Sequence, residues 1–125
     1  MGIRSDVGLA LSRTGAEALR AAGYDVTLLF DTVDVIEGSR ADIESGKVDP
    51  ADIGAELHTV QDIKWYVDSY EDIKALYREL EKLDDEDYLL LQACSEYPDS
   101  GEDRGDYYDN PFDLCKRVSA VLNWC

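Results

Sequence analysis

The sequence predicts a single α+β domain of two layers, in which an antiparallel-rich four-stranded sheet carries two or three helices on one face. The chain of 125 residues is long enough for one domain and short for two. Apolar residues alternate with a period of two in some segments and recur with helical spacing in others. The resulting order is strand, helix, a second short helix, strand, helix and two strands, and it favours helices packed on one side of a sheet.

The N-terminal part is expected to form a strand and then a helix. Residues 3–11 place their aliphatic side chains mainly on one side, which indicates a strand. Thr14 and Glu17 have the spacing of a capping box, and Gly23 is suited to the position just beyond a helix end. A short helix is therefore predicted between Thr14 and Gly23.

The following segment is harder to interpret. Residues 26–36 combine an apolar stripe of helical spacing with many β-branched residues, and the helical interpretation is preferred over the strand. Residues 39–54 are polar and interrupted by glycines, which indicates a loop with a turn of helix after Asp49-Pro50.

The second half is predicted to hold a strand, a helix and two more strands. Alternation over residues 56–67 indicates a strand, and Ser69 can cap the helix that follows. The apolar stripe of this helix consists of Ile73, Leu76, Tyr77, Leu80 and Leu83. The apolar run 88–94 indicates a buried strand. Residues 112–124 fit either a helix or a strand, and the strand is preferred.

Charge is the most unusual property of the chain. Twenty-eight acidic residues against 12 basic ones give a formal net charge of −16. Such a field repels nucleic acid and anionic membranes and attracts basic protein surfaces. The alternative is that acidity serves only solubility or adaptation to a salty host. The N-terminus lacks the pattern of a signal peptide, and the apolar runs are too short to span a bilayer, so a cytoplasmic location is expected.

The cysteines, the histidine and the possible nucleophiles do not have the spacing of a known catalytic motif. Cys94, Cys115 and Cys125 lack the paired spacing of a disulfide framework or a zinc site. The single histidine, His58, has no obvious nucleophile nearby in the sequence and is interpreted as structural. Neither a triad nor a glycine-rich phosphate loop is recognisable. We therefore predict no enzyme, no metal and no cofactor, although a hydrolase using a carboxylate pair is an alternative.

Two stretches of the sequence carry a resemblance. One is the opening Met-Gly-Ile-Arg-Ser-Asp-Val of residues 1–7, and the other is Ile-Lys-Trp-Tyr at 63–66, followed by an amphipathic helix and Asp-Glu-Asp-Tyr at 85–88. Together they resemble small uncharacterised proteins of tailed bacteriophages. Because that family carries no agreed activity, the resemblance implies no functional residues.

The extent of the resemblance bears on organisation. It covers residues 1–11 and about 57–125, and it leaves about 24–55 as a variable insertion within a single domain of residues 1–125. It implies a phage origin, with the host cytoplasm as location, and it supports the strand over 112–124.

Acidic residues are concentrated in the last third of the chain. Eleven acidic residues and one basic residue, Arg104, lie between Asp84 and Asp113. Carboxylates at phosphate-like spacings can imitate a nucleic-acid backbone and occupy a basic groove. The predicted partner-binding residues are Glu96, Asp99, Glu102, Asp103, Asp106, Tyr107, Tyr108 and Asp109. A secondary acidic cluster comprises Asp84, Asp85, Glu86 and Asp87. If strands 88–94 and 112–124 pair, the first cluster lies at one strand end and the long loop at the other.

Each of these residues has a competing interpretation. The acidic loop fits a solvated connection without a partner. Tyrosines among acids suit a protein interface, but they suit a position at the edge of the core equally well. The loop also holds oxygen donors for calcium, yet Gly101 and Arg104 stand where an EF-hand needs other residues.

The leading functional hypothesis is a phage-encoded inhibitor or host-modulating, anti-defence protein. It would bind the basic surface of a host protein, such as a nuclease or another nucleic-acid-binding protein, by contacts that mimic DNA. Direct binding to nucleic acid or membrane is not expected. The alternatives are a small structural or adaptor phage protein whose acidity serves solubility, and the minor hydrolase.

Overall fold

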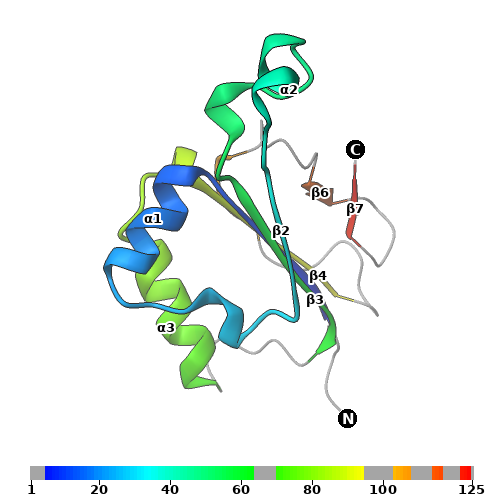
Figure 1. Cartoon of the computed structure of the whole chain (residues 1–125). Coiled ribbons are helices and arrows are strands. Elements are labelled where there is room, and N and C mark those ends of the chain that lie inside the picture. Colours follow the sequence, from blue (N-terminus) through cyan, green and yellow to red (C-terminus); the bar gives the residue numbers. More distant parts are fainter. Residues whose placement is uncertain (1–4, 64–69, 95–102, 108–113, 117–121, 125) are drawn as a thin grey trace.

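The fold is of the α+β class, with helices on one side of an antiparallel sheet (Figure 1). The computed structural model describes residues 5–63, 70–94, 103–107, 114–116 and 122–124. The main sheet has five strands in the order β2-β3-β1-β4-β5, one more than the sequence suggested. Its strands are β1 (Ser5–Leu11), β2 (Thr32–Val35), β3 (Glu56–Ile63), β4 (Tyr88–Cys94) and β5 (Asp103–Gly105). The predicted fold class is therefore confirmed.

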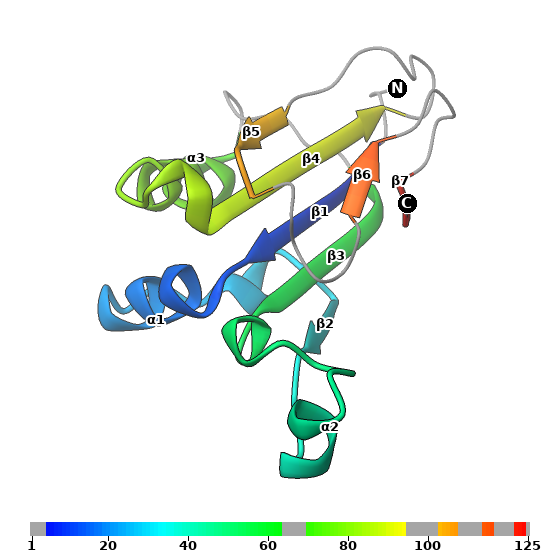
Figure 2. The same cartoon turned by 90° about the horizontal axis from the view of Figure 1, so that it is seen from above.

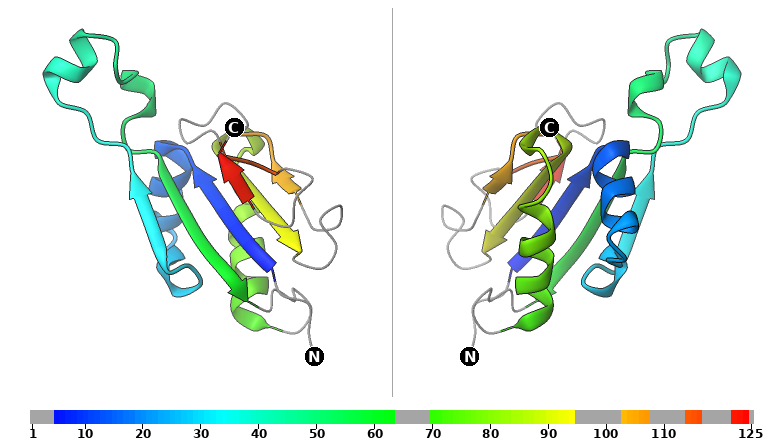
Figure 3. Two further views of the ribbon diagram at one scale, coloured as in Figure 1. Left: turned by 90° about the vertical axis from the view of Figure 1, so that its right-hand side faces the viewer. Right: turned by 90° about the vertical axis from the view of Figure 1, so that its left-hand side faces the viewer.

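The helices α1 (Arg13–Ala21) and α3 (Glu71–Leu80) cover one face of this sheet (Figures 1 and 3). Two further strands, β6 (Leu114–Lys116) and β7 (Leu122–Trp124), pair with each other and contact β1 and β4. Figure 2 shows this pair on the side of the sheet opposite to α1 and α3. The single strand expected over 112–124 was thus wrong in its extent, and β4 pairs with β1 and β5 instead.

The helix-covered face holds the main core. Antiparallel register places Leu9 of β1 between His58 of β3 and Leu90 of β4, so residues directly opposite one another share this face. The predicted stripe of α3 packs here, with Ile73, Leu76, Tyr77 and Leu80 buried and Leu83 partly buried. A smaller cluster on the other face contains Ala10, Leu57, Leu89, Leu91 and Tyr107. Because β1 is central and buried on both faces, it anchors both clusters.

Helix α1 is delimited by hydrogen bonds at both ends. The side chain of Ser12, not Thr14, caps its start by accepting from the backbone of Gly15 at 3.1 Å. Gly23 has φ of 77°, and the next residue, Tyr24, donates to the carbonyl of Leu19 at 3.0 Å. This is the Schellman arrangement, and it confirms Gly23 as the helix stop.

The helix preferred for residues 26–36 is wrong. One turn of 3₁₀ helix, η1 (Val26–Leu28), is followed by β2, which pairs with β3. The β-branched residues of β2 suit the edge of a sheet better than a helix, where their χ1 freedom is reduced. Pairing with β3 therefore outweighed the helical apolar spacing.

The segment between β2 and β3 extends away from the sheet (Figures 1 and 3). It was expected to be a loop, but it contains the short helix α2 (Arg40–Glu44), which Ser39 caps and which buries no residue. The predicted turn after Asp49 is present as the 3₁₀ helix η2 (Pro50–Asp52).

Strand β3 confirms the predicted strand as far as Ile63, and residues 64–67 of that prediction lie outside the described residues. Helix α3 begins at Glu71 after Tyr70, which makes no side-chain cap. The predicted cap Ser69 also lies outside the described residues. Among the helices that the structure describes, none has the length and apolar character needed to cross a membrane.

Candidate functional site

The two predicted acidic clusters meet at one end of β4. The 3₁₀ helix η3 (Asp85–Asp87) precedes β4, and β5 returns along β4 so that Gly105 lies opposite Leu89. The backbone N–H of Asp106 donates to the carbonyl of Asp85 at 2.7 Å. The expectation that the clusters occupy opposite strand ends is therefore wrong for their described members, because β5 is the neighbour of β4.

The contact between η3 and β5 creates a surface that we call the acidic end. Its members are exposed: Asp84, Asp85, Glu86, Asp103 and Asp106. Residues far apart in the sequence thus contribute carboxylates to one region, which strengthens the local negative potential. The predicted residues Glu96, Asp99, Glu102, Tyr108 and Asp109 lie outside the described residues.

Asp87 has a structural role that separates it from this surface. Its carboxylate accepts a hydrogen bond at 2.9 Å from the hydroxyl of Ser12, and its carbonyl accepts from the Ser12 backbone. A Cβ atom at Gly15 would lie 2.6 Å from the Asp87 carbonyl oxygen, so η3 packs closely on the start of α1. A negative charge there is favourable because the helix N-terminus carries partial positive charge.

Gly105 fixes the position of β5. Its φ is 84°, and a Cβ atom at this residue would lie 2.1 Å from the carbonyl oxygen of Tyr88. Only glycine adopts this conformation and permits this approach without strain. Beyond it, the N–H of Tyr107 donates to the same Tyr88 carbonyl at 3.1 Å.

Arg104 is directed towards α3. Its guanidinium lies 3.7 Å from the carboxylate of Glu81 and 4.6 Å from the centroid of the Tyr77 ring. Arg104 is the only basic residue between Asp84 and Asp113, and these contacts join it to α3.

The two described tyrosines near the acidic end, Tyr88 and Tyr107, are both buried. Tyr107 has 8% of its surface exposed and belongs to the smaller core cluster, which also contains Leu57 and Leu91. This burial fits the alternative of a tyrosine at the edge of the core, and the partner-binding role of Tyr107 stays a prediction. Burial also raises the pKa of Tyr88, and the nearby Asp85 carboxylate adds to that rise.

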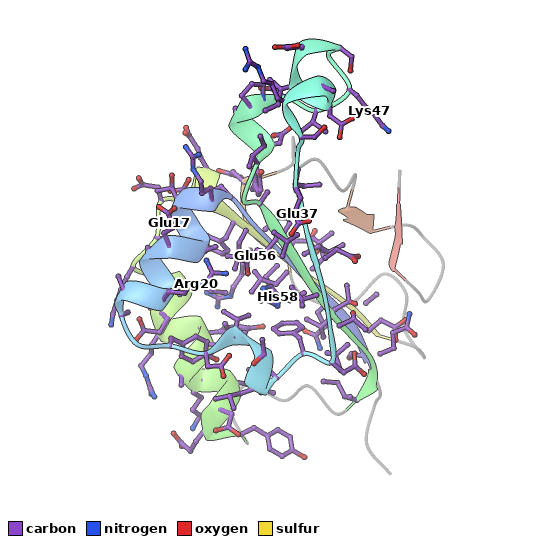
Figure 4. The ribbon with its side chains drawn as sticks, viewed as in Figure 1. Glu17, Arg20, Glu37, Lys47, Glu56 and His58 are labelled. Atoms are coloured by element: carbon purple, nitrogen blue, oxygen red, sulfur yellow. The ribbon has the colours of Figure 1, made fainter. Side chains whose placement is uncertain are left out.

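Sequence reasoning missed a group of interacting polar side chains, partly buried between α1 and β3. Glu56 and His58 are 5% and 3% exposed, and both lie on the helix-covered face of β3. Nε2 of His58 lies 2.9 Å from the Glu56 carboxylate, and Arg20 of α1 pairs with the other oxygen of that carboxylate. Figure 4 shows these three side chains between α1 and β3. Alternation of position along β3 was the available signal, because it places 56 and 58 on one face with Val60.

The ring of His58 is neutral, and its Nδ1 atom can accept a hydrogen bond. Burial lowers the pKa of His58 despite the opposing effect of the Glu56 carboxylate. Because a carboxylate only accepts, the neutral ring carries its hydrogen on Nε2, which leaves Nδ1 as an acceptor. Nδ1 is buried and has no hydrogen-bond partner among the described residues. A cavity of about 70 Å³ adjoins the group and is also lined by Tyr24 and Asp25.

The surroundings of this cavity favour a structural role for His58. Hydrogen bonds from the side chain and backbone of Thr27 lower the pKa of Asp25, while burial raises that of Tyr24 to about 12. His58 and Glu56 bond to each other, and no nucleophile is bonded to either among the described residues. Those residues also contain no group of three or more side chains suited to hold a metal ion.

Comparison with protein-family models, curated protein sequences and solved structures finds no match to this chain.

Proposed function

We propose that this chain is a binding protein whose acidic end docks onto the basic surface of another protein. The observation that carries the proposal is the contact between η3 and β5, which brings two acidic segments together through the Asp106–Asp85 backbone bond. Exposed carboxylates attract Lys and Arg side chains and form charge-assisted hydrogen bonds with them.

The fold supports a rigid presentation of these charges. Gly105 seats β5 against Tyr88, and Ser12 ties η3 to the start of α1. A backbone that is already held in position loses less conformational freedom on binding than a free loop does. This arrangement suits a surface that imitates the phosphates of a nucleic acid.

The expected partner is a nucleic-acid-binding protein with a cationic groove, such as a nuclease. The resemblance to bacteriophage proteins supports a host protein as target, and it makes inhibition of host defence the expected outcome of binding. The chain itself would not bind DNA or RNA, since its net charge of −16 repels phosphates. On this proposal the chain is not an enzyme.

The test compares two variants of equal charge. The acidic-end variant carries Asp84→Asn, Asp85→Asn, Glu86→Gln and Asp106→Asn. The control variant carries Glu37→Gln, Glu44→Gln, Glu71→Gln and Asp72→Asn, all exposed positions outside the acidic end. Each is titrated into host nucleases bound to a fluorescent DNA duplex, across about 0.05–0.5 M salt.

The parent chain should displace the duplex, and its association rate should fall as salt rises. The acidic-end variant should be weaker by at least about tenfold while the control stays close to the parent. Equal losses in both variants would mean that only net charge matters. Binding of the duplex by the chain itself would contradict the mimicry.

A further inference from the structure

The outer edge of β2 is a second interaction surface of different chemistry. In the part of the chain that the structure describes, β2 pairs with β3 on one side only and forms an edge of the main sheet (Figure 3, left). All four of its residues are exposed, including Val33 at 46% and Val35 at 47%. An exposed sheet edge with apolar side chains is a template for another strand.

The hydrogen-bond register shows which backbone groups face outwards. Ile36 donates to the carbonyl of Ala55 at 2.9 Å, directly beyond the pair Val35–Glu56. Because bonded and non-bonded pairs alternate in an antiparallel ladder, the bonded pairs of β2 are those of Thr32 and Asp34. The N–H and C=O groups of Val33 and Val35 are therefore directed away from β3.

The side chains of β2 also alternate. Val33 and Val35 lie opposite His58 and Glu56, on the helix side of the sheet, whereas Asp34 lies opposite Leu57 on the other side. A strand added at this edge would meet apolar side chains at every second position. Between those positions it would meet polar and acidic ones.

Charge selects among the strands that could bind there. Asp31, Asp34 and Glu37 are exposed along and beside the edge, and residues 31–54 contain seven acidic and two basic residues. A second copy of the chain would bring like charges together, and the net charge of −16 opposes that pairing. A basic strand would be attracted instead.

We propose that β2 accepts an extended segment of a partner protein in which basic and apolar residues alternate. The segment adds an antiparallel or parallel sixth strand to the main sheet, with backbone bonds to Val33 and Val35 and its basic side chains beside Asp34. This site is independent of the acidic end, because the two lie at opposite edges of the sheet.

The probe is a short synthetic peptide that alternates valine and lysine, with a second peptide of equal composition interrupted by a central proline as its control. Amide hydrogen exchange followed by NMR on the parent chain reports the site directly. Saturating peptide should slow the exchange of the Val33 and Val35 amides by at least about fivefold, since a new strand protects the outward N–H groups. The proline peptide should not.

Two matched variants sharpen the test. Val33→Pro removes an outward N–H and leaves the bonds to β3 in place, so it should weaken binding of the peptide by at least about tenfold without loss of fold. Leu28→Ala, at an apolar residue that is 73% exposed and lies outside β2, should bind like the parent. The acidic-end variant should also bind like the parent, which separates this proposal from the proposed function.

Three outcomes would overturn the proposal. The first is peptide binding at saturation with unchanged exchange at Val33 and Val35. The second is equal affinity for the two peptides. The third is a dimer, seen by sedimentation, whose formation protects the same amides, because a second copy would then be the occupant.

Discussion

β5 and β2 form the two edges of the main sheet, and they differ in what supports them. At β5, Tyr107 fills the smaller core cluster and Gly105 fits against the backbone of Tyr88. At β2, every side chain is exposed, and the segment that follows contains a helix with no buried residue. The carboxylates near β5 thus lie on a segment that is packed against the core. Those near β2 lie beside an exposed strand edge. Acidity alone therefore does not determine what kind of partner a surface suits.

Truncation of a side chain at each edge should show the largest contrast. Tyr107→Ala removes a buried ring and should lower the free energy of unfolding by about 3–5 kcal/mol. Val35→Ala removes a half-exposed side chain and should cost less than about 1 kcal/mol. Urea denaturation of both variants checks this. Comparable losses at the two positions would show that β5 is no better supported than β2.

Glycine substitutions test the same contrast through the backbone. Gly105→Ala combines a left-handed conformation with a Cβ that would meet a carbonyl oxygen, and should cost about 3 kcal/mol. Gly46→Ala, beyond α2, has φ of 78° and open space around the added Cβ. It should cost only about 1–2 kcal/mol from conformation. The denaturation midpoints of the two variants, measured under the same conditions, test this difference. A loss of stability in Gly46→Ala as large as that in Gly105→Ala would contradict close packing at β5.

Helix caps provide a smaller contrast. Ser12→Ala at α1 should lower the free energy of unfolding by about 1 kcal/mol, and it also releases the Asp87 side chain. Ser39 caps α2 in the same manner, but α2 buries no residue. Ser39→Ala should therefore fray α2 without a measurable change in global stability. Hydrogen exchange resolves local fraying from global unfolding.

The sequence predicted the fold class and the best-patterned elements. Helix α3 and strand β4 were foreseen because long apolar patterns reflect burial directly. Residues 26–36 were mispredicted because their edge strand owes its structure to pairing with β3, which is 20 or more residues away in sequence. Local spacing carries no information about such a partner.

The candidate site was predictable in composition and not in arrangement. Clustered acids were evident, but the return of β5 beside η3 depends on Gly105, whose role appears only when Tyr88 is placed against it. Tyr107 could not be assigned because an interface tyrosine and a core tyrosine look alike in sequence. His58 was interpreted as structural from the sequence, but its bond to Glu56 became visible only with both residues on one face of β3.

The smallest expected effect is a pH dependence that arises on β3, the neighbour of β2, where His58 is paired with Val33. Burial holds the pKa of folded His58 below its ordinary value of 6.5. The unfolded chain therefore binds a proton more readily than the fold does, so His58 destabilises the fold as pH drops below about 6.5. His58→Gln retains a donor for Glu56 but does not titrate. From about pH 7 to pH 5, the parent should lose free energy of unfolding relative to this variant.

Chemical denaturation at several pH values measures the difference in free energy of unfolding between the parent and His58→Gln. Protonation of the many carboxylates reduces charge repulsion equally in both chains, so it does not affect this difference. Asp25 provides a second comparison, because the pKa of its own carboxyl is lowered from 3.8 by hydrogen bonds from Thr27. Its stabilising contribution is lost only as pH falls below about 4, outside the window of His58. The Asp25 carboxylate also raises the pKa of His58, so in Asp25→Asn the loss between about pH 7 and pH 5 should be at least as large as in the parent. A parallel course of parent and His58→Gln over that range would show that the buried ring accepts its proton as easily in the fold as in the unfolded chain.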